Sequence, residues 1–232
     1  MKPRPTSLLA LALLFTLGSL LSAEDKKTSG KSLFDGKTLQ GWDGNPKFWS
    51  VKDGVITGQT TETNPTKGNT FLIWRAGTLE NFELELEFRM VGGNSGIQYR
   101  SKDLGNWVVG GYQADIDATF KFIGILYEER GRGILAQRST KVEITESGEK
   151  KTVGTTGKDE EILAGIQKEK WNKYFISAQG NHLVQKINGK VTVDVTDNQA
   201  SKRAMKGILA LQLHAGPPML VQFRKITLRE LK

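Results

Sequence analysis

Hydrophobic and polar residues alternate along most of the chain with the period of two that is typical of β-strands. The clearest run is residues 82–90, FELELEFRM, in which apolar side chains occupy one face and glutamates and an arginine the other. Similar patterns predict strands at residues 70–75, 96–101, 112–117, 123–129, 142–146, 174–179, 208–214 and 220–228. In the last run the apolar positions change phase, which predicts a β-bulge near Arg224 and Lys225.

Turn signals separate these runs. Asp53-Gly54 and Asn188-Gly189 each lie between two strand-like segments and predict hairpins, the second more strongly because Asn-Gly suits a type I′ turn. Only residues 159–167 have a helical pattern, and the glycines and threonines of residues 152–158 predict a loop. Many short strands with at most one or two short helices indicate an all-β fold, a β-sandwich or jelly roll.

The first 23 residues have the composition of a secretory signal peptide. Basic Lys2 and Arg4 precede an apolar stretch at residues 8–21, and Ser22-Ala23 supplies small residues for cleavage. This apolar stretch is short for a membrane span, although a retained membrane anchor is the alternative interpretation. The chain has no cysteine to which a lipid could be attached. We therefore expect an exported bacterial protein, periplasmic or extracellular and not a lipoprotein, without a membrane span after signal removal. The expected divisions are a signal peptide at 1–23, a linker at 24–30 and one domain at 31–232.

The amino-acid composition argues against nucleic-acid binding and excludes chemistry that depends on cysteine. The chain carries a formal charge of +8, to which Lys2 and Arg4 contribute two. The remaining lysines and arginines are scattered and form no dense run beside aromatic residues, so a solvated basic surface is favoured over nucleic-acid binding. The absence of cysteine excludes disulfides, thiol nucleophiles and thiolate-bound zinc.

Three of the predicted strands have an unusual polar face. An ordinary solvent face carries lysine, glutamate and threonine, whereas these faces carry side chains that form directional hydrogen bonds. If the three strands are neighbours, they form the floor of a polar groove suited to a hydroxyl-rich ligand such as a sugar. If they are not, each is a plain solvated face. The residues are Gln98 and Arg100 on the first strand, Gln113, Asp115 and Asp117 on the second, and Gln212 and His214 on the third.

Other polar and aromatic residues lie near these strands. Asn94 follows the glycine pair of residues 92–93, and Trp107 lies in a loop from which it could stack on a sugar ring. Residues 125–133, ILYEERGRG, place charged groups beside an aromatic ring, and simple surface ion pairs are the alternative interpretation. The notable side chains of that run are Tyr127, Glu128 and Arg130. The other tryptophans, Trp42, Trp49, Trp74 and Trp171, are expected in the core, and His182 at an exposed hairpin edge.

Motifs along the whole predicted domain resemble those of the bacterial 3-keto-disaccharide hydrolase domain family. These are exported jelly-roll proteins related to the concanavalin A-like and laminin G-like sandwiches. The order and spacing of the motifs over nearly 200 residues carry the resemblance. The matching stretches are LFDGKTLQGW, WSVKDGVITG, FELELEFRM, GGNSGIQYR, GGYQADID, GILYEERGRG, INGK, GILALQLH and FRKITL.

The resemblance implies a substrate class, glycosides oxidised to a ketone at C3. Such a ketone acidifies the C2 proton, so a base can remove it, the C1 leaving group departs by elimination, and water adds to the enone. One position departs from the family pattern of Tyr-Glu-x-Gln followed by an aspartate. Here Gln113 stands in place of the glutamate and Asp115 in place of the amide. We expect that the acid and the amide are exchanged on one strand face and that Asp115 takes over the role of the acid.

The expected roles follow from this chemistry. The base is Asp115 or His214, the latter because its ordinary pKa lies near working pH. Arg100 and Gln98 bind the ketone or enolate oxygen, and Glu128 or Tyr127 is the acid. The other residues expected to hold the hydroxyls and rings of the substrate are Asn94, Trp107, Gln113, Asp117, Arg130 and Gln212.

Alternatives remain at this level. Because the usual glutamate is missing, the domain could be a non-catalytic, lectin-like carbohydrate-binding module. A cationic envelope-surface protein is a third, weaker reading that rests on net charge alone. Asp115, Asp117 and Glu128 offer oxygen ligands for a divalent cation, but no spacing requires one, so no cofactor is assigned. The expected partner is an oxidised, 3-keto sugar or glycoside, and the sequence does not define the oligomeric state.

Overall fold

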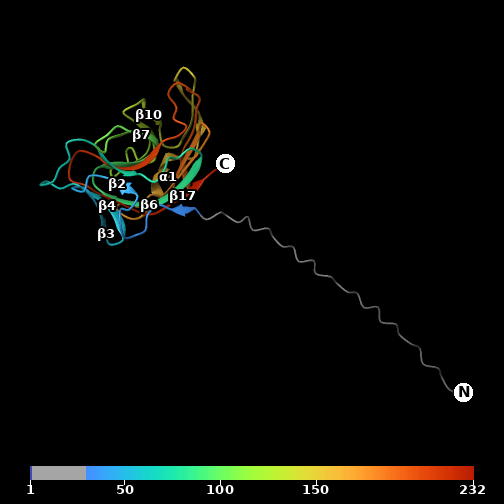
Figure 1. Ribbon diagram of the computed structural model, residues 1–232. Coiled ribbons are helices and arrows are strands. Elements are labelled where there is room, and N and C mark those ends of the chain that lie inside the picture. The colour runs from blue at the N-terminus through green and yellow to red at the C-terminus, as the bar shows by residue number, and fades with distance from the viewer. Residues whose placement is uncertain (2–29) are drawn as a thin grey trace.

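The computed structural model of this chain describes residue 1 and residues 30–232, which form two β-sheets packed face to face (Figure 1). The predicted all-β sandwich is confirmed. The expected signal peptide and linker lie, apart from Met1 and Gly30, outside the described residues. One α-helix is found in the described residues, α1 (Asp159–Ala164), and none there is long and apolar enough to cross a membrane.

The larger sheet has ten strands. Their bounds are β1 (Lys31–Ser32), β3 (Trp49–Lys52), β4 (Val55–Gln59), β6 (Phe82–Val91), β11 (Thr140–Ile144), β12 (Lys150–Thr155), β13 (Asn172–Gln179), β14 (His182–Ile187), β15 (Lys190–Asp197) and β17 (Leu220–Glu230). Their order is β12-β11-β15-β14-β13-β6-β17-β4-β3, with β1 paired to β17. The pairing of β11 with β15 is parallel, and the other pairs of this sheet are antiparallel.

The smaller sheet has seven strands. Their bounds are β2 (Trp42–Asp43), β5 (Thr70–Trp74), β7 (Asn94–Asp103), β8 (Val109–Asp117), β9 (Leu126–Glu129), β10 (Gly133–Ala136) and β16 (Ile208–Leu213). The order is β10-β9-β8-β7-β16-β5-β2. The three strands with polar faces, β8, β7 and β16, are therefore immediate neighbours, although β16 follows β8 by some 90 residues of chain.

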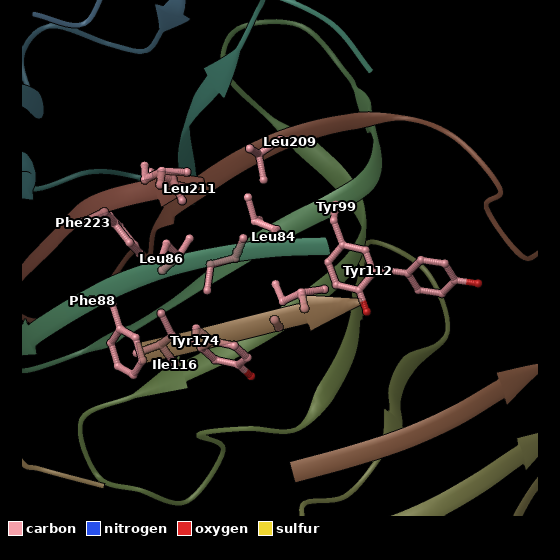
Figure 2. Packing of buried hydrophobic residues seen from close by; sticks show 14 of the residues in the cluster. Leu84, Leu86, Phe88, Tyr99, Tyr112, Ile116, Tyr174, Leu209, Leu211 and Phe223 are labelled. Atoms are coloured by element: carbon pink, nitrogen blue, oxygen red, sulfur yellow. The ribbon is translucent and has the colours of Figure 1, made fainter. Parts of the chain in front are cut away.

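The core lies between the two sheets and is built from the apolar phase of each strand (Figure 2). On β6 the predicted alternation is confirmed, with Leu84 and Leu86 buried and the charged residues between them partly exposed. Tyr99 and Tyr112 come from the smaller sheet, and their ring centroids lie 5.7 Å apart. Burial of each such large side chain contributes about 1.5–3 kcal/mol, so the two apolar faces hold the sheets together.

The turn and bulge predictions are confirmed. Asn188 and Gly189 have φ values of 48° and 84°, the left-handed conformation that a type I′ turn requires at both central positions. Asp53-Gly54 likewise joins β3 to β4 as a hairpin. In β17 the register shifts between Arg224 and Thr227, which returns the later apolar residues to the core face.

Three predictions about elements need correction. The loop expected at residues 152–158 is in part strand β12, whose polar residues pair with β11 along one edge and are otherwise exposed. The strand expected from residue 123 begins at Leu126, and the helix expected up to residue 167 ends at Ala164 before Gly165. Strand β12 is defined by its pairing with β11, which the residue pattern of 152–158 does not report.

Trp171 is not a core residue, in contrast to the other three tryptophans assigned to the core. It is partly exposed between two guanidinium groups, those of Arg89 and Arg224, which lie 5.4 Å and 4.0 Å from its ring centroid. Cation–π contacts of this kind stabilise an aromatic side chain at a surface, so an apolar sequence context did not require burial here.

Candidate active site

A groove of about 450 Å³ lies on the outer face of the smaller sheet, on the side of β8 opposite the core residues Tyr112, Ala114 and Ile116. It brings together seven of the residues that the sequence singled out. They are Asn94, Gln113, Asp115, Asp117, Tyr127, Gln212 and His214. The remaining lining residues are Asn69, Phe122, Ile125, Glu129 and Ile134. A polar floor with a few apolar walls suits a ligand that carries many hydrogen-bonding groups.

The register of β7 with β8 explains why these side chains meet. Asn94 pairs with Asp117, Gly96 with Asp115, and Gln98 with Gln113, so one face carries only polar groups and a glycine. A Cβ atom at Gly96 would lie 2.4 Å from Cδ of Gln113. The glycine therefore makes room for the Gln113 side chain to lie across β7 toward the groove.

Asp115 is the most perturbed carboxyl group of the groove. It is 5% exposed, and Nδ2 of Asn94 donates a hydrogen bond of 2.8 Å to its Oδ1. Burial raises the pKa of Asp115 to about 7, the hydrogen bond from Asn94 opposes this shift, and the charge of Asp117 adds to it. A carboxylate poised near neutral pH is suited to accept and release a proton.

Asp117 connects the end of β8 to the following loop. Its Oδ2 accepts hydrogen bonds from Oγ1 of Thr119, at 2.5 Å, and from the backbone N–H of Phe122, at 3.1 Å. These contacts hold the loop that carries Phe122 and Ile125 to the groove wall. Asp117 thus both shapes the groove and supplies the negative charge that opposes ionisation of Asp115.

His214 follows directly after β16 and closes one side of the groove. Its Nδ1 donates a hydrogen bond to the carbonyl oxygen of Ala215. The N–H of Ala215 in turn donates to Oδ1 of Asn69, at 3.0 Å. Because Nδ1 carries the donated proton, Nε2 of the neutral ring has the free electron pair and can accept a proton.

Glu129 is a groove residue that the sequence reasoning missed. Its carboxylate accepts hydrogen bonds from Nδ2 of Asn69, at 3.3 Å, and from Nε2 of Gln212, at 3.4 Å. The period of two could have found it, because Glu129 lies two residues after Tyr127 on β9 and shares its face. Asn69 precedes β5 in an irregular segment, and no pattern in the sequence marked it.

The side-chain amide of Gln212 is fully buried, and only one of its two polar atoms has a hydrogen-bond partner. Its Nε2 donates to Glu129, whereas Oε1 has no hydrogen-bond partner among residues 30–232. A buried acceptor left without a donor costs free energy.

Arg100 is not a groove residue, contrary to the prediction. It has a φ of 47°, and the register of β7 with β8 shifts between Tyr99 and Lys102. This bulge removes Arg100 from the phase of Gln98. Its guanidinium donates to the backbone oxygens of Glu80, at 2.7 Å, and Gly180, at 2.6 Å. Arg100 therefore joins loops at the end of the sandwich and does not reach the groove.

Glu128 also lies outside the groove. It is on the opposite face of β9 from Tyr127, and its Oε2 accepts a hydrogen bond of 2.7 Å from Nε of Arg132. The same guanidinium binds the fully buried Asp197 at 2.7 Å. Of the three carboxylates that offered oxygen ligands for a cation, Asp115 and Asp117 therefore line the groove and Glu128 does not. No cluster of three metal-ligating side chains occurs in the part of the chain that the structure describes.

Three further predicted binding residues lie elsewhere. Trp107 donates from Nε1 to Oδ1 of Asp43, at 2.8 Å, and does not line the groove. Arg130 is exposed beyond the end of β9 and lines a separate hollow. Gln98 does not line the groove but is fully buried beside Gln113, where its Nε2 donates to Oε1 of Gln113, at 2.7 Å. Gln98 therefore orients a groove residue without facing a ligand.

Known structures share this architecture. A candidate glycosyl hydrolase from Parabacteroides distasonis matches with a TM-score of 0.58 and 23% identity, covering 87% of this chain and 98% of that one. A carbohydrate-binding module, CBM66, from Bacillus subtilis matches with a TM-score of 0.55 and 13% identity over 82% of this chain and 96% of that one. A β-glucanase from Bacillus licheniformis has a TM-score of 0.51 at 10% identity, covering 89% and 100%. These likenesses establish the jelly-roll fold.

Comparison with known sequences identifies the family of the chain, which the structural likenesses do not. A 3-keto-disaccharide hydrolase from Bacteroides thetaiotaomicron is 35% identical over 82 residues. The aligned stretch is 32% of this chain and only 28% of that relative. The profile of the 3-keto-alpha-glucoside-1,2-lyase-like domain matches residues 29–229, nearly the whole chain. With the sandwich fold and a polar groove in place, this match shows that the chain belongs to the 3-keto-alpha-glucoside-1,2-lyase-like domain family.

Proposed function

We propose that this protein cleaves the glycosidic bond of glycosides that carry a ketone at C3. The reaction would proceed by removal of the C2 proton, elimination of the C1 leaving group and addition of water. The observation that carries the proposal is Asp115, a buried carboxyl group with a pKa of about 7 at the centre of a sugar-sized polar groove. Family membership and the name of the Bacteroides relative support the substrate class.

Asp115 is our choice for the base. A carboxylate with an ordinary pKa is too weak to take a carbon-bound proton, and burial strengthens it here by destabilising its charged form. The C3 ketone acidifies the neighbouring C2 proton enough for such a base to remove it. The exchange of acid and amide along β8 places this base two residues from Gln113, on the same face.

The enolate oxygen needs hydrogen-bond donors once Arg100 is excluded. The amides of Gln113 and Asn94 are donors that line the groove. Donors already positioned before reaction stabilise developing negative charge most effectively.

Tyr127 is our choice for the group that protonates the leaving oxygen. It lines the groove, and Glu128, the alternative from sequence, does not. Burial raises the pKa of Tyr127, and the carboxylates of Glu129 and Asp115 raise it further. Its hydroxyl therefore remains protonated at neutral pH and can donate.

Exchange of Tyr127 for phenylalanine is expected to lower kcat by about a hundredfold for sugar leaving groups. A nitrophenyl leaving group departs without protonation, so its elimination rate should change less than about threefold. The measurement is kcat for a 3-keto-disaccharide and for a nitrophenyl 3-keto-glucoside, with wild type and Tyr127→Phe. An equal loss with both substrates would show that Tyr127 does not protonate the leaving group.

The charge of Asp117 should be visible in the pH profile. If Asp115 is the base, kcat/KM rises with pH and levels off above an apparent pKa of about 7. Because the charge of Asp117 raises the pKa of Asp115, Asp117→Asn should move this limb to lower pH. Asparagine keeps an oxygen for the contacts to Thr119 and Phe122. An unmoved limb in the variant would assign the titration to another group, with His214 the first candidate.

The decisive experiment compares a 3-keto-disaccharide with its unoxidised parent. Purified protein is incubated with each, with and without a chelator, and released sugar and enone absorbance are followed. Release from the keto form alone supports the proposal. Saturable binding of the sugars without release from either would instead indicate a lectin-like binding module, in which Gln113 replaces the acid of the family with a neutral amide.

We also propose that the protein is exported, from the composition of its first 23 residues. Expression of the full chain in a bacterial host, followed by cell fractionation, tests this. The expected result is a protein in the periplasm or medium whose N-terminus, read by mass spectrometry, follows Ala23. Recovery of the intact chain with the membrane fraction would show a retained anchor.

A further inference from the structure

A second hollow, of about 470 Å³, lies beside the groove, and Glu129 lines both. We call it the basic hollow, because five cationic side chains and only two carboxylates line it. The cations are Arg100, Lys102, Arg130, Arg132 and Lys202, and the carboxylates are Glu128 and Glu129. The proposed function does not use this hollow.

Four of the five cationic side chains of the basic hollow have no carboxylate partner among residues 30–232. Arg132 is paired with Glu128 and the underlying Asp197. Arg100, 1% exposed, is held by backbone carbonyls and the amide of Asn81, which are neutral partners. The exposed cations have no ion pair among residues 30–232, and these are Lys102, Arg130 and Lys202.

A buried arginine without a carboxylate partner is costly. Burial lowers the pKa of Arg100, because its charged form is poorly solvated. An anion bound in the basic hollow would offset this desolvation cost, because it would attract the positive charge of the Arg100 guanidinium. Arg100 and Arg130 both line the basic hollow, and both have a left-handed backbone, with φ values of 47° and 54°.

The basic hollow can be reached from the groove along β8. Gly110 and Gly111 line the hollow, and Gln113 lines the groove two residues further on the same strand. Gly111 pairs with Glu129, so on this side of the sheet no bulky β8 side chain separates the two spaces. Two residues of a strand span roughly 7 Å, a distance that one substrate can bridge.

We propose that the basic hollow binds an anionic substituent, a carboxylate, sulfate or phosphate, on the part of the glycoside that lies beyond the scissile bond. The inference rests on the proposed function and specifies its substrate class as acidic glycosides. Lysine and arginine recognise such groups by charge-assisted hydrogen bonds. The basic hollow then selects among 3-keto-glycosides by the charge of their leaving group.

The test uses two matched substrates, the 3-keto-glucosides of 4-carboxyphenol and of 4-(hydroxymethyl)phenol. KM and kcat are measured for wild type, for the double variant Lys102→Gln with Arg130→Gln, and for the control Lys37→Gln with Lys47→Gln. Lys37 and Lys47 are exposed and line neither space, and the control removes the same charge. Binding of the two unoxidised parent glucosides is measured by calorimetry on the same three proteins.

The wild type should favour the carboxylate substrate in KM by about five- to tenfold. The preference should vanish in the Lys102 and Arg130 double variant, persist in the control, and weaken in 0.5 M salt. Equal KM values in the wild type, or equal loss in both double variants, would overturn the proposal. If neither 3-keto-glucoside is cleaved, the proposed function fails, and calorimetry with the parent glucosides still decides whether the basic hollow selects the anion.

Discussion

Replacing Asp115 by asparagine is expected to lower kcat/KM for a 3-keto-glycoside by about a thousandfold, the usual contribution of a positioned general base. Asparagine has nearly the same shape and keeps an oxygen for the hydrogen bond from Asn94. The loss would therefore come from the missing base and not from a collapsed groove. Binding of the unoxidised parent sugar, measured by calorimetry, should stay within about threefold of wild type.

The same substitution should stabilise the folded protein at high pH. The pKa of Asp115 is raised in the folded state to about 7 from 3.8, so between these values the folded protein binds more protons than the unfolded chain. Stability conferred by this group consequently falls as pH rises from about 4 to about 7. Asp115→Asn lacks this penalty, and its unfolding free energy relative to wild type should increase by about 2–3 kcal/mol between pH 5 and pH 8.

Urea unfolding at the two pH values, followed by fluorescence, measures this difference. His214→Ala is the informative comparison, because it removes the other candidate base and leaves Asp115 in place. A variant at Asp115 that retains full turnover would remove this residue from the mechanism. Loss of turnover without a pH-dependent gain in stability would separate its catalytic role from its burial.

Replacing Arg132 by methionine is expected to destabilise the fold by about 3–5 kcal/mol, because it leaves two buried carboxylates without a cation. The Arg132 guanidinium lies 2.7 Å from both Glu128 and Asp197, and Asp197 also accepts a hydrogen bond from the hydroxyl of Tyr112. Burial alone lowers the pKa of Arg132, but the two carboxylates outweigh it and raise the pKa overall. The pair thus ties β9 to the end of β15 in the other sheet.

Thermal unfolding should show the loss as a fall in Tm of roughly 10 °C. Arg130→Met is the matched control, since Arg130 is exposed and has no ion pair among the described residues, and its effect should stay below about 0.5 kcal/mol. Glu128→Gln should likewise lower Tm while leaving kcat near wild type. A loss of kcat with an unchanged Tm in that variant would return Glu128 to the catalytic candidates.

The groove is open to a ligand, yet the carboxyl group of Asp115 on its floor is buried. Its floor is a strand face that the neighbouring glycine and amides keep open, and its central carboxyl group is buried at the expense of stability. Functional sites commonly retain such costs because the surrounding fold compensates for them. Here the compensation comes from two apolar strand faces and from buried ion pairs such as that of Arg132.

Much of the fold could be predicted from the sequence, because its causes are local. The alternation of Leu84 and Leu86 with charged residues follows from the geometry of a strand, and Asn188-Gly189 encodes its own turn. The same local rule placed Gln113, Asp115 and Asp117 on one face. Applied to β9, the same rule places Glu129 on the face of Tyr127 and Glu128 on the opposite face.

Only the tertiary structure decided which polar residues became the site. The adjacency of β16 to β7 brings His214 and Gln212 to the groove across about 100 residues of chain. A bulge moves Arg100 away from the face that periodicity predicts, and there its guanidinium binds the backbone oxygens of the distant Glu80 and Gly180. The ion pair of Glu128 with Arg132 also depends on folding, because the same guanidinium binds Asp197, 69 positions after Glu128 in the sequence. Periodicity describes which face a residue takes within its own strand, whereas burial, pairing and pKa depend on groups that folding brings from elsewhere.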